Sequence, residues 1–346
     1  MSLCPGEKLR YAETHFKFKL PWSLIFRPWP EIIFDIPFQV VPGVVPTLWI
    51  AIRDADRFPT NIKTVSIDIC KKDENENVYC EQIQLNVLAN KNIEFIPVPL
   101  KNLAPGKYRI TPTVEVSRTI GKKEVTKKFT RWNLPGLKAE PLHLHVLAEP
   151  TPKAPGFIAG EMHCHTHYSR DHVEFGATPA VFQQAAKAVG LDFVSCTDHA
   201  YDFAFTEEDY TQEAESPAPR FKKLCDEIAE VNANRNVKIH AGENSDSKND
   251  SNLPLIIAGE EVSAGNSKGE NVHVTVMAPD GYLPGLGDCG RYWLSNKPTC
   301  KISQILESTQ AHCFAAHPFQ SIGSLEKFIF RRGYWIHEDL NIGKIN

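Results

Sequence analysis

The chain has 346 residues, of which 42% are hydrophobic and 23% charged, and a formal net charge of −4. This length favours two domains, and the composition is ordinary for a globular protein. No stripe of Lys and Arg dominates any segment, which argues against nucleic-acid binding. No apolar run approaches the roughly 18 residues that a membrane-spanning helix needs, so no membrane partner is expected.

The first part of the chain, up to residue 148, has the pattern of short strands separated by turns. In the clearest strand Val65, Ile67 and Ile69 alternate with polar residues, as in a strand with one buried face. The expected strands are 32–41, 47–53, 62–70, 78–87, 93–99, 106–116, 124–132 and 142–147. Strands at this spacing predict an antiparallel, immunoglobulin-like β-sandwich over residues 1–150, including an N-terminal extension.

The pattern changes after residues 148–156, where three prolines and one glycine predict a linker. Residues 157–163 predict a strand, Thr178-Pro179 begins a helix that Gly190 ends, and residues 191–197 predict a buried strand. This strand–helix–strand unit predicts a parallel α/β sheet in a second domain, residues 157–346. Further helices are expected at 219–234 and 302–310, and further strands at 237–241, 255–262, 272–278 and 313–316.

The most informative residues are His163 and His165, which flank Cys164 at the end of the first of these strands. Side chains two residues apart on a strand point to one face, so both imidazoles can reach one metal ion or two adjacent ions, while Cys164 points away. Other candidate ligands are placed where strands end or near those ends, as in α/β barrels: Asp171, His199, Glu261, His273 and His317. Taken alone, His273 is also compatible with a structural histidine and His317 with a turn histidine.

These motifs resemble a known family. The runs His163-Cys164-His165-Thr166, Thr197-Asp198-His199, Gly259-Glu260-Glu261 and His317-Pro318, with Asp171, are similar to the polymerase-and-histidinol-phosphatase (PHP) domain. The run 163–171 followed by Thr178-Pro179 is most similar to the carbaryl-hydrolase-like (CehA/McbA) branch of that family. The resemblance spans most of the second domain.

The resemblance implies a distorted (β/α)7 barrel that holds two or three divalent metal ions, of manganese, zinc or iron. It implies as ligands His163, His165, Asp171, His199, Glu261, His273 and His317, with Glu261 preferred to Glu260 as the third residue of the Gly-x-Glu pattern. The family closes its site with a late Asp-x-His pair, which this chain lacks after His317, and only about six barrel strands are visible. The sequence therefore predicts an incomplete barrel whose C-terminal part is missing, and this leaves the activity of the chain open.

The function expected from these features is metal-dependent hydrolysis by a multinuclear site that activates water. A phosphoesterase acting on a small anionic phosphoester is favoured by the frequency of that activity in the family, with carbamate or ester hydrolysis as the alternative. A non-catalytic binding protein with a degenerate barrel is the alternative from another class. His167 is the candidate proton donor to the leaving group, and Arg170 is the candidate for stabilising negative charge on the substrate.

The nine cysteines lack the spacing of a zinc ribbon and predict reduced thiols, which favours the cytoplasm. Cys70 and Cys80 flank a turn and would be the pair to form a disulfide if the compartment were oxidising. An extracytoplasmic location stays open in the case that a leader preceded the present N-terminus.

Overall fold

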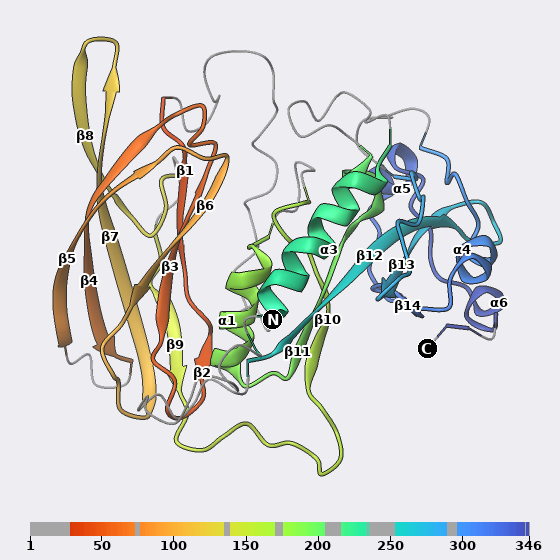
Figure 1. Ribbon diagram of the computed structural model, residues 1–346, viewed down its shortest axis with the longest axis horizontal. Coiled ribbons are helices and arrows are strands. Elements are labelled where there is room, and N and C mark those ends of the chain that lie inside the picture. The colour runs from red at the N-terminus through yellow and green to blue at the C-terminus, as the bar shows by residue number, and fades with distance from the viewer. Residues whose placement is uncertain are drawn as a thin grey trace. The chain divides into compact units, whose positions relative to one another are not determined.

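The computed structural model describes residues 28–72, 77–134, 139–169, 176–204, 216–233, 235, 253–288, 296–342 and 344–345. The chain divides into two compact units, shown in Figure 1. The first comprises Met1–Phe157 and Lys187–Gly190, and the second comprises Ile158–Ala186 and Leu191–Asn346. The change of unit at Phe157 directly follows the proline-containing stretch that predicts a linker.

The first unit is built from two β-sheets whose strands run in similar directions in Figure 1. One sheet has the order β1 (Glu31–Asp35), β3 (Thr47–Arg53), β6 (Ile93–Pro99). The other has the order β2 (Gln39–Val40), β9 (Leu142–Val146), β7 (Gly106–Ile120), β4 (Thr60–Lys71), β5 (Asn77–Ala89), and β8 (Lys123–Thr130) pairs with β7. Every pairing is antiparallel except that of β2 with β9. Ile50 of the first sheet and Ile67 of the second are fully buried in one apolar core, so the two sheets bury their inner faces together.

One predicted strand of this unit is wrong in a way that proline explains. The sequence predicts a single strand over residues 32–41, whereas the chain forms β1 and β2, which belong to different sheets. Pro37 lies between them and has no backbone N–H to give to a ladder, so the strand is interrupted there and the chain passes from one sheet to the other. The immunoglobulin-like sandwich stays a prediction.

The second unit contains a five-stranded sheet whose spatial order follows the chain: β10 (Gly160–Cys164), β11 (Phe193–His199), β12 (Leu255–Gly265), β13 (Asn271–Met277) and β14 (His312–Ala315). The first three strands are parallel, as expected, but β13 is antiparallel to both β12 and β14. The link between β12 and β13 is a tight turn in which Asn266 N–H donates to the Glu270 carbonyl, and so short a link can join only antiparallel strands. The (β/α)7 barrel stays a prediction.

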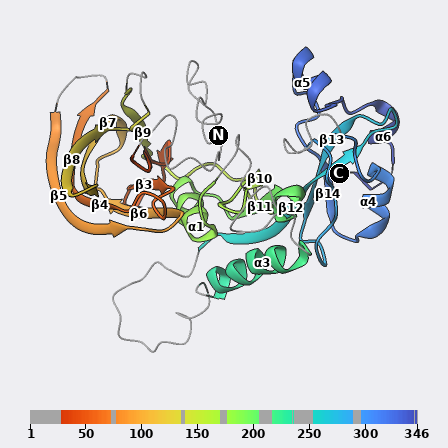
Figure 2. The same cartoon turned by 90° about the horizontal axis from the view of Figure 1, so that it is seen from above.

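The helices of the chain agree in part with the expected ones. The predicted helices are confirmed as α1 (Pro179–Val189), α3 (Ala218–Ala233) and α4 (Ile302–Ser308), and α3 packs along β12 on one side of the sheet (Figures 1 and 2). The short helices α2 (Ala200–Phe203), α5 (Ser324–Ile329) and α6 (His337–Leu340) were not predicted. The expected strand 237–241 lies outside the described residues. Among the helices that the structure describes, none combines the length and the apolar character needed to cross a membrane.

Candidate metal centre

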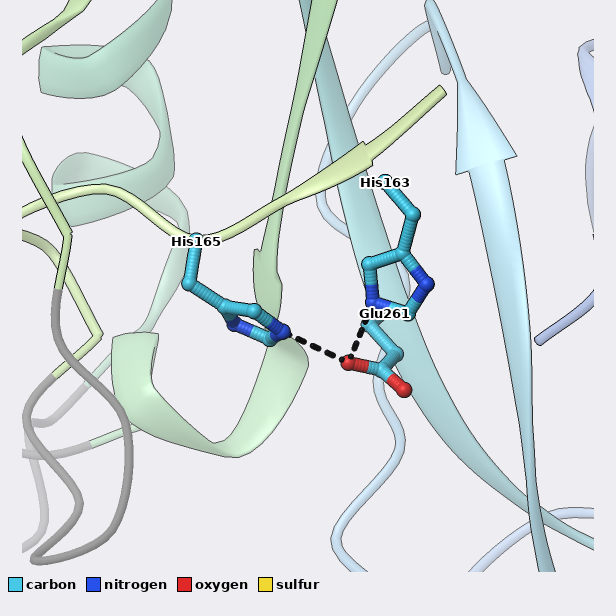
Figure 3. A group of neighbouring side chains, drawn as sticks. All are labelled: His163, His165 and Glu261. Carbon is cyan, nitrogen blue, oxygen red and sulfur yellow. Dashed lines mark hydrogen bonds and ion pairs between the residues drawn. The ribbon is translucent and has the colours of Figure 1, made fainter. Parts of the chain in front are cut away.

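The carboxylate of Glu261 lies in the middle of a cluster of histidines in the second unit. Glu261 is on β12, and its side chain is only 1% exposed. Its Oε2 atom is 3.0 Å from Nε2 of His163, 3.1 Å from Nε2 of His165 and 3.2 Å from Nδ1 of His199. Figure 3 shows the first two imidazoles converging on this one oxygen from β10 and the segment that follows it. Three nitrogens therefore share a single carboxylate oxygen.

The other oxygen of Glu261 faces two further histidines. Oε1 is 2.5 Å from Nδ1 of His273 and 2.9 Å from Nε2 of His317. His273 is fully buried, whereas the side chain of His317 is 39% exposed and borders the solvent. One carboxylate is thus surrounded by five imidazole nitrogens, three from strands of the sheet and two from the segments that follow β10 and β14.

Strand register explains why three of these groups meet. His199 is the last residue of β11 and is the direct register partner of Glu261 on β12. On the other side of β12, His273 is paired with Ser263, which puts it on the diagonal from Glu261 and on the same face of the sheet. Side chains placed in this way on adjacent strands come within reach of one another without any loop having to position them.

Two of the remaining three histidines, His163 and His317, are placed by irregular backbone. The ladder between β10 and β11 shifts register between Glu161 and Cys164, and His163 lies within this irregular stretch. His317 follows the end of β14 with φ = 32°, in the left-handed region that non-glycine residues rarely adopt. Such strained positions persist only where the surrounding structure over-determines them, and they cluster at functional sites.

The loop that carries His165 is held by a buried carboxylate, Asp198, which points to the face opposite its neighbour His199. Asp198 accepts hydrogen bonds from both the backbone N–H and the hydroxyl of Thr166, at 2.7 and 2.8 Å. It also accepts from the backbone N–H and the hydroxyl of Ser169, at 3.0 and 2.8 Å. Four donors from one short loop therefore end on Asp198.

A second buried carboxylate, Asp288, lies on the outer side of His273. Both of its oxygens are 3.0 Å from Nε2 of His273. Asp288 also accepts hydrogen bonds from the hydroxyl of Ser263 at 2.8 Å and from Nε of Arg332 at 2.7 Å. His273 therefore lies between two carboxylates, Glu261 on the inside and Asp288 on the outside.

The pKa values of this group follow from burial and from mutual attraction. Burial by itself would raise the pKa of the Glu261 and Asp288 carboxyls, but the charge of His273 outweighs it, assisted by His199 and Arg332 respectively, and both pKa values lie well below the usual range. Burial would likewise lower the pKa of His273, but its two carboxylate neighbours raise that pKa to about 10. His273 thus lies between two carboxylates that both favour its protonated form.

The donor set fits a divalent transition metal. The ligand atoms of His163, His165 and Glu261 lie within 4.8 Å of one another, as do those of His199, Glu261 and His273. Imidazole nitrogen and carboxylate oxygen are the ligands that zinc, manganese and iron take in proteins. A carboxylate offers about four lone-pair positions, fewer than the five imidazoles that face Glu261, so hydrogen bonding alone does not account for the cluster.

A pocket with a volume of ≈ 330 Å³, much of it open to solvent, lies beside the histidines. His273, His317, Asp288 and Arg332 contribute to its wall. The wall is completed by Asn271, Val272, Ala316, Pro318, Gln320, Ile322, Gly333, Tyr334 and Trp335. A small molecule in this pocket would contact the exposed side of His317 and the aromatic rings near the end of the chain.

The structure places most of the predicted site residues in one cluster. His163, His165 and His199 contact Glu261, and so do His273 and His317. Asp171 and Arg170 lie outside the described residues. Nε2 of His167 lies 3.5 Å from Oε2 of Glu227 on α3.

Glu260 faces away from the histidines, and one of its oxygens accepts a hydrogen bond from the backbone N–H of Leu283 at 2.9 Å. Burial raises the pKa of this carboxyl well above its usual value. Of the two neighbouring glutamates, Glu261 is therefore the one that the fold brings to the cluster.

Asp288, Ser169, Ser263 and Arg332 were not predicted to contribute. Ser169 lies within the run 163–171 but was given no role, and the other three lie outside the histidine-containing motifs. A signal for Asp288 was present in the two glycines before it. A Cβ at Gly287 would lie 2.3 Å from Oδ1 of Asn271, and a Cβ at Gly285 would lie 2.3 Å from the Val262 side chain, so only glycine lets this loop approach β12 and β13.

No family model and no curated protein matches the chain.

Proposed function

We propose that the second unit is a PHP-type domain and that the chain is a metal-dependent hydrolase. The observation that carries the proposal is the position of Glu261, a buried carboxylate with five imidazole nitrogens at 2.5–3.2 Å. Burying so many polar and ionisable groups together is costly unless they serve one charged ligand. Bound manganese, zinc or iron, two or three ions in all, would lower the pKa of a coordinated water toward neutrality and supply the nucleophile.

The side chains of the chain itself would have distinct tasks. His163, His165, His199, His273 and Glu261 would hold the metal ions, and Asp171 is proposed as a further ligand. His317, partly exposed and lining the pocket, would hold an ion on the side from which substrate enters. The buried, hydrogen-bonded surroundings keep these groups in place and limit the access of bulk water.

His167 is proposed as the acid that protonates the leaving group, and Arg170 as the group that stabilises negative charge on the substrate. The contact between His167 and Glu227 is the kind of histidine–carboxylate pair that raises imidazole basicity. Burial raises the pKa of Glu227 itself, so this carboxyl is a weaker counter-charge for His167 as the pH is lowered.

The proposed substrate is a small anionic phosphoester, and hydrolysis of a carbamate or carboxylic ester is the alternative. The pocket beside His317 combines the guanidinium of Arg332 with the aromatic side chains of Tyr334 and Trp335. This combination suits a molecule with one polar and one apolar end, which an aryl phosphate and an aryl carbamate both are.

The test is metal analysis and hydrolysis by the whole purified chain. We expect at least about one manganese, zinc or iron ion per chain by mass spectrometry, and turnover of an aryl phosphate with added Mn²⁺ that exceeds turnover of an aryl carbamate. The variant His143→Ala, in the histidine pair of β9, is the matched control and should behave as the wild type. A chain without metal and without turnover of either ester would leave the non-catalytic binding protein as the better description.

We propose a cytoplasmic location, because free thiols persist in a reducing compartment. All the cysteines within the described residues are free, including Cys70 and Cys80, the pair that would close the hairpin between β4 and β5.

A further inference from the structure

The orientation of His165 is determined by a chain of two hydrogen bonds. Asp198 is fully buried and accepts two backbone N–H groups, and its Oδ1 atom also accepts the hydroxyl proton of Ser169. The Ser169 oxygen has then given its only proton away and can only accept from His165, whose Nδ1 lies 3.0 Å away. A neutral His165 therefore carries its proton on Nδ1 and presents a lone pair on Nε2.

This lone pair faces another electron-rich atom. Nε2 of His165 is 3.1 Å from Oε2 of Glu261, which also offers lone pairs. Two acceptors at hydrogen-bond distance with no proton between them repel each other. The contact becomes favourable when a cation lies against both atoms.

His273 shows the same arrangement with its two nitrogens exchanged. Its Nε2 lies 3.0 Å from both oxygens of Asp288, and Asp288 is itself fixed by Arg332 and Ser263. When a cation takes the lone pair on Nδ1, which faces Oε1 of Glu261, the proton of a neutral His273 lies on Nε2, where Asp288 accepts it.

We infer that Ser169, backed by Asp198, and Asp288 are positioning residues that select the tautomers of His165 and His273 for metal binding. They hold the proton of each ring on the outer nitrogen, Nδ1 of His165 and Nε2 of His273, so that the inner nitrogens are ready to bind a divalent cation. Partners of this kind orient ligand imidazoles and increase their basicity. The inference rests on the proposed metal centre, but it assigns roles to residues outside the ligand set.

The backbone supports each of these partners independently of any ion. The loop of Ser169 is held by Asp198 through Thr166 as well. Arg332 is brought to Asp288 because the chain at Arg331 and Gly333 pairs with the backbone of Asn271 at the start of β13. These contacts hold Ser169 and Arg332 beside their partners, as a positioning role requires.

The first experiment measures Zn²⁺ affinity by calorimetry, with the whole chain freed of metal by a chelator. Ser169→Ala should weaken binding by about 10–100-fold, the usual cost of losing such a partner, and Ser169→Thr, which keeps the hydroxyl, should restore most of it. Asp288→Ala should weaken binding to a similar extent. Ser308→Ala removes a hydroxyl that bonds only within α4 and is the matched control, expected to bind Zn²⁺ as the wild type does.

The second experiment reads the tautomers directly. In the Zn²⁺-loaded wild type with ¹⁵N-labelled histidine, long-range ¹H–¹⁵N spectra should place the proton of His165 on Nδ1 and that of His273 on Nε2. The reverse assignment for either ring would overturn the inference for that ring, even if Asp288→Ala fails to fold. If Ser169→Ala binds Zn²⁺ as tightly as the wild type does, the inference is overturned for His165, but the proposed metal centre is not. A wild type that binds no metal would instead refute the proposed function.

Discussion

His199 and Glu261 are direct register partners on the parallel strands β11 and β12, and Nδ1 of the one lies 3.2 Å from Oε2 of the other. The residues that precede them, Asp198 and Glu260, are partners as well, and they point to the opposite face of the sheet. A single pair of strands therefore builds the cluster on one face and two buried carboxyl groups that anchor loops on the other. Neighbouring glutamates with such different surroundings allow matched tests.

Replacing Glu261 by Gln should abolish metal binding, whereas replacing Glu260 by Gln should not. The first change removes the charge of the carboxylate that contacts all five imidazoles, so affinity should fall by more than the roughly 10–100-fold cost of losing an outer partner. The second change lies on the far face of β12. Metal content of the two variants, measured on chains purified in parallel, tests this expectation, and equal metal content would contradict it.

Glu260→Gln should also change how stability depends on pH. Burial raises the pKa of Glu260 in the folded chain above its unfolded value of about 4.5, so the folded state keeps a proton that the unfolded state releases. Stability is then lost as the pH rises from about 4.5 toward the raised folded pKa, by at most about 1.4 kcal/mol per pH unit. Urea denaturation from pH 5 to 8 should show the wild type losing stability relative to Glu260→Gln, and parallel curves would contradict the prediction.

His273 should also make the free energy of unfolding of the metal-free chain depend on pH. Its pKa is raised to about 10 by Asp288 and Glu261, against about 6.5 in the unfolded chain. The stabilisation is fully present below about pH 6.5 and is lost as the pH rises through 10, again by at most about 1.4 kcal/mol per unit. With a chelator present, His273→Gln should reduce the decline in free energy of unfolding between pH 6.5 and 9. An unchanged decline would show that His273 is neutral in the metal-free chain.

Gly287→Ala should disrupt the position of Asp288. An added Cβ would lie 2.3 Å from Oδ1 of Asn271 and 2.8 Å from Cβ of Ser263, so the loop must shift, at a cost of about 1–3 kcal/mol. Gly281→Ala is the matched control, because nothing lies within 4 Å of the Cβ that it adds. Urea denaturation should show a loss of stability for the first variant and almost none for the second, and Zn²⁺ affinity should fall only in the first.

The sequence predicted the parts of the centre that depend on local pattern. His163 and His165 are recognisable from their spacing, and His199 from its place at the end of an apolar strand. The fold brings these residues and Glu261 together because parallel strands align their carboxyl ends. The helix from Pro179 to Val189 was predicted correctly because its first and last residues have explicit capping signals.

What the sequence did not predict depends on contacts between distant segments. Asp288 lies in a loop without periodicity, and its partners His273 and Arg332 are 15 and 44 residues away in the chain. The antiparallel orientation of β13 follows from the tightness of the turn at Asn266, which an apolar strand pattern does not encode. The roles of Asp171 and Arg170 stay predictions.

The left-handed backbone at His317 has a consequence for evolution and engineering. His317 has a backbone conformation that glycine adopts with less strain, so selection for stability alone would favour His317→Gly. Selection for the proposed metal centre would oppose this change. Under the proposed function, thermal stability and metal binding would therefore make opposite demands on this position. A screen for heat resistance that ignores activity should find replacements here before it finds them at His199, whose backbone has an ordinary φ of −58°.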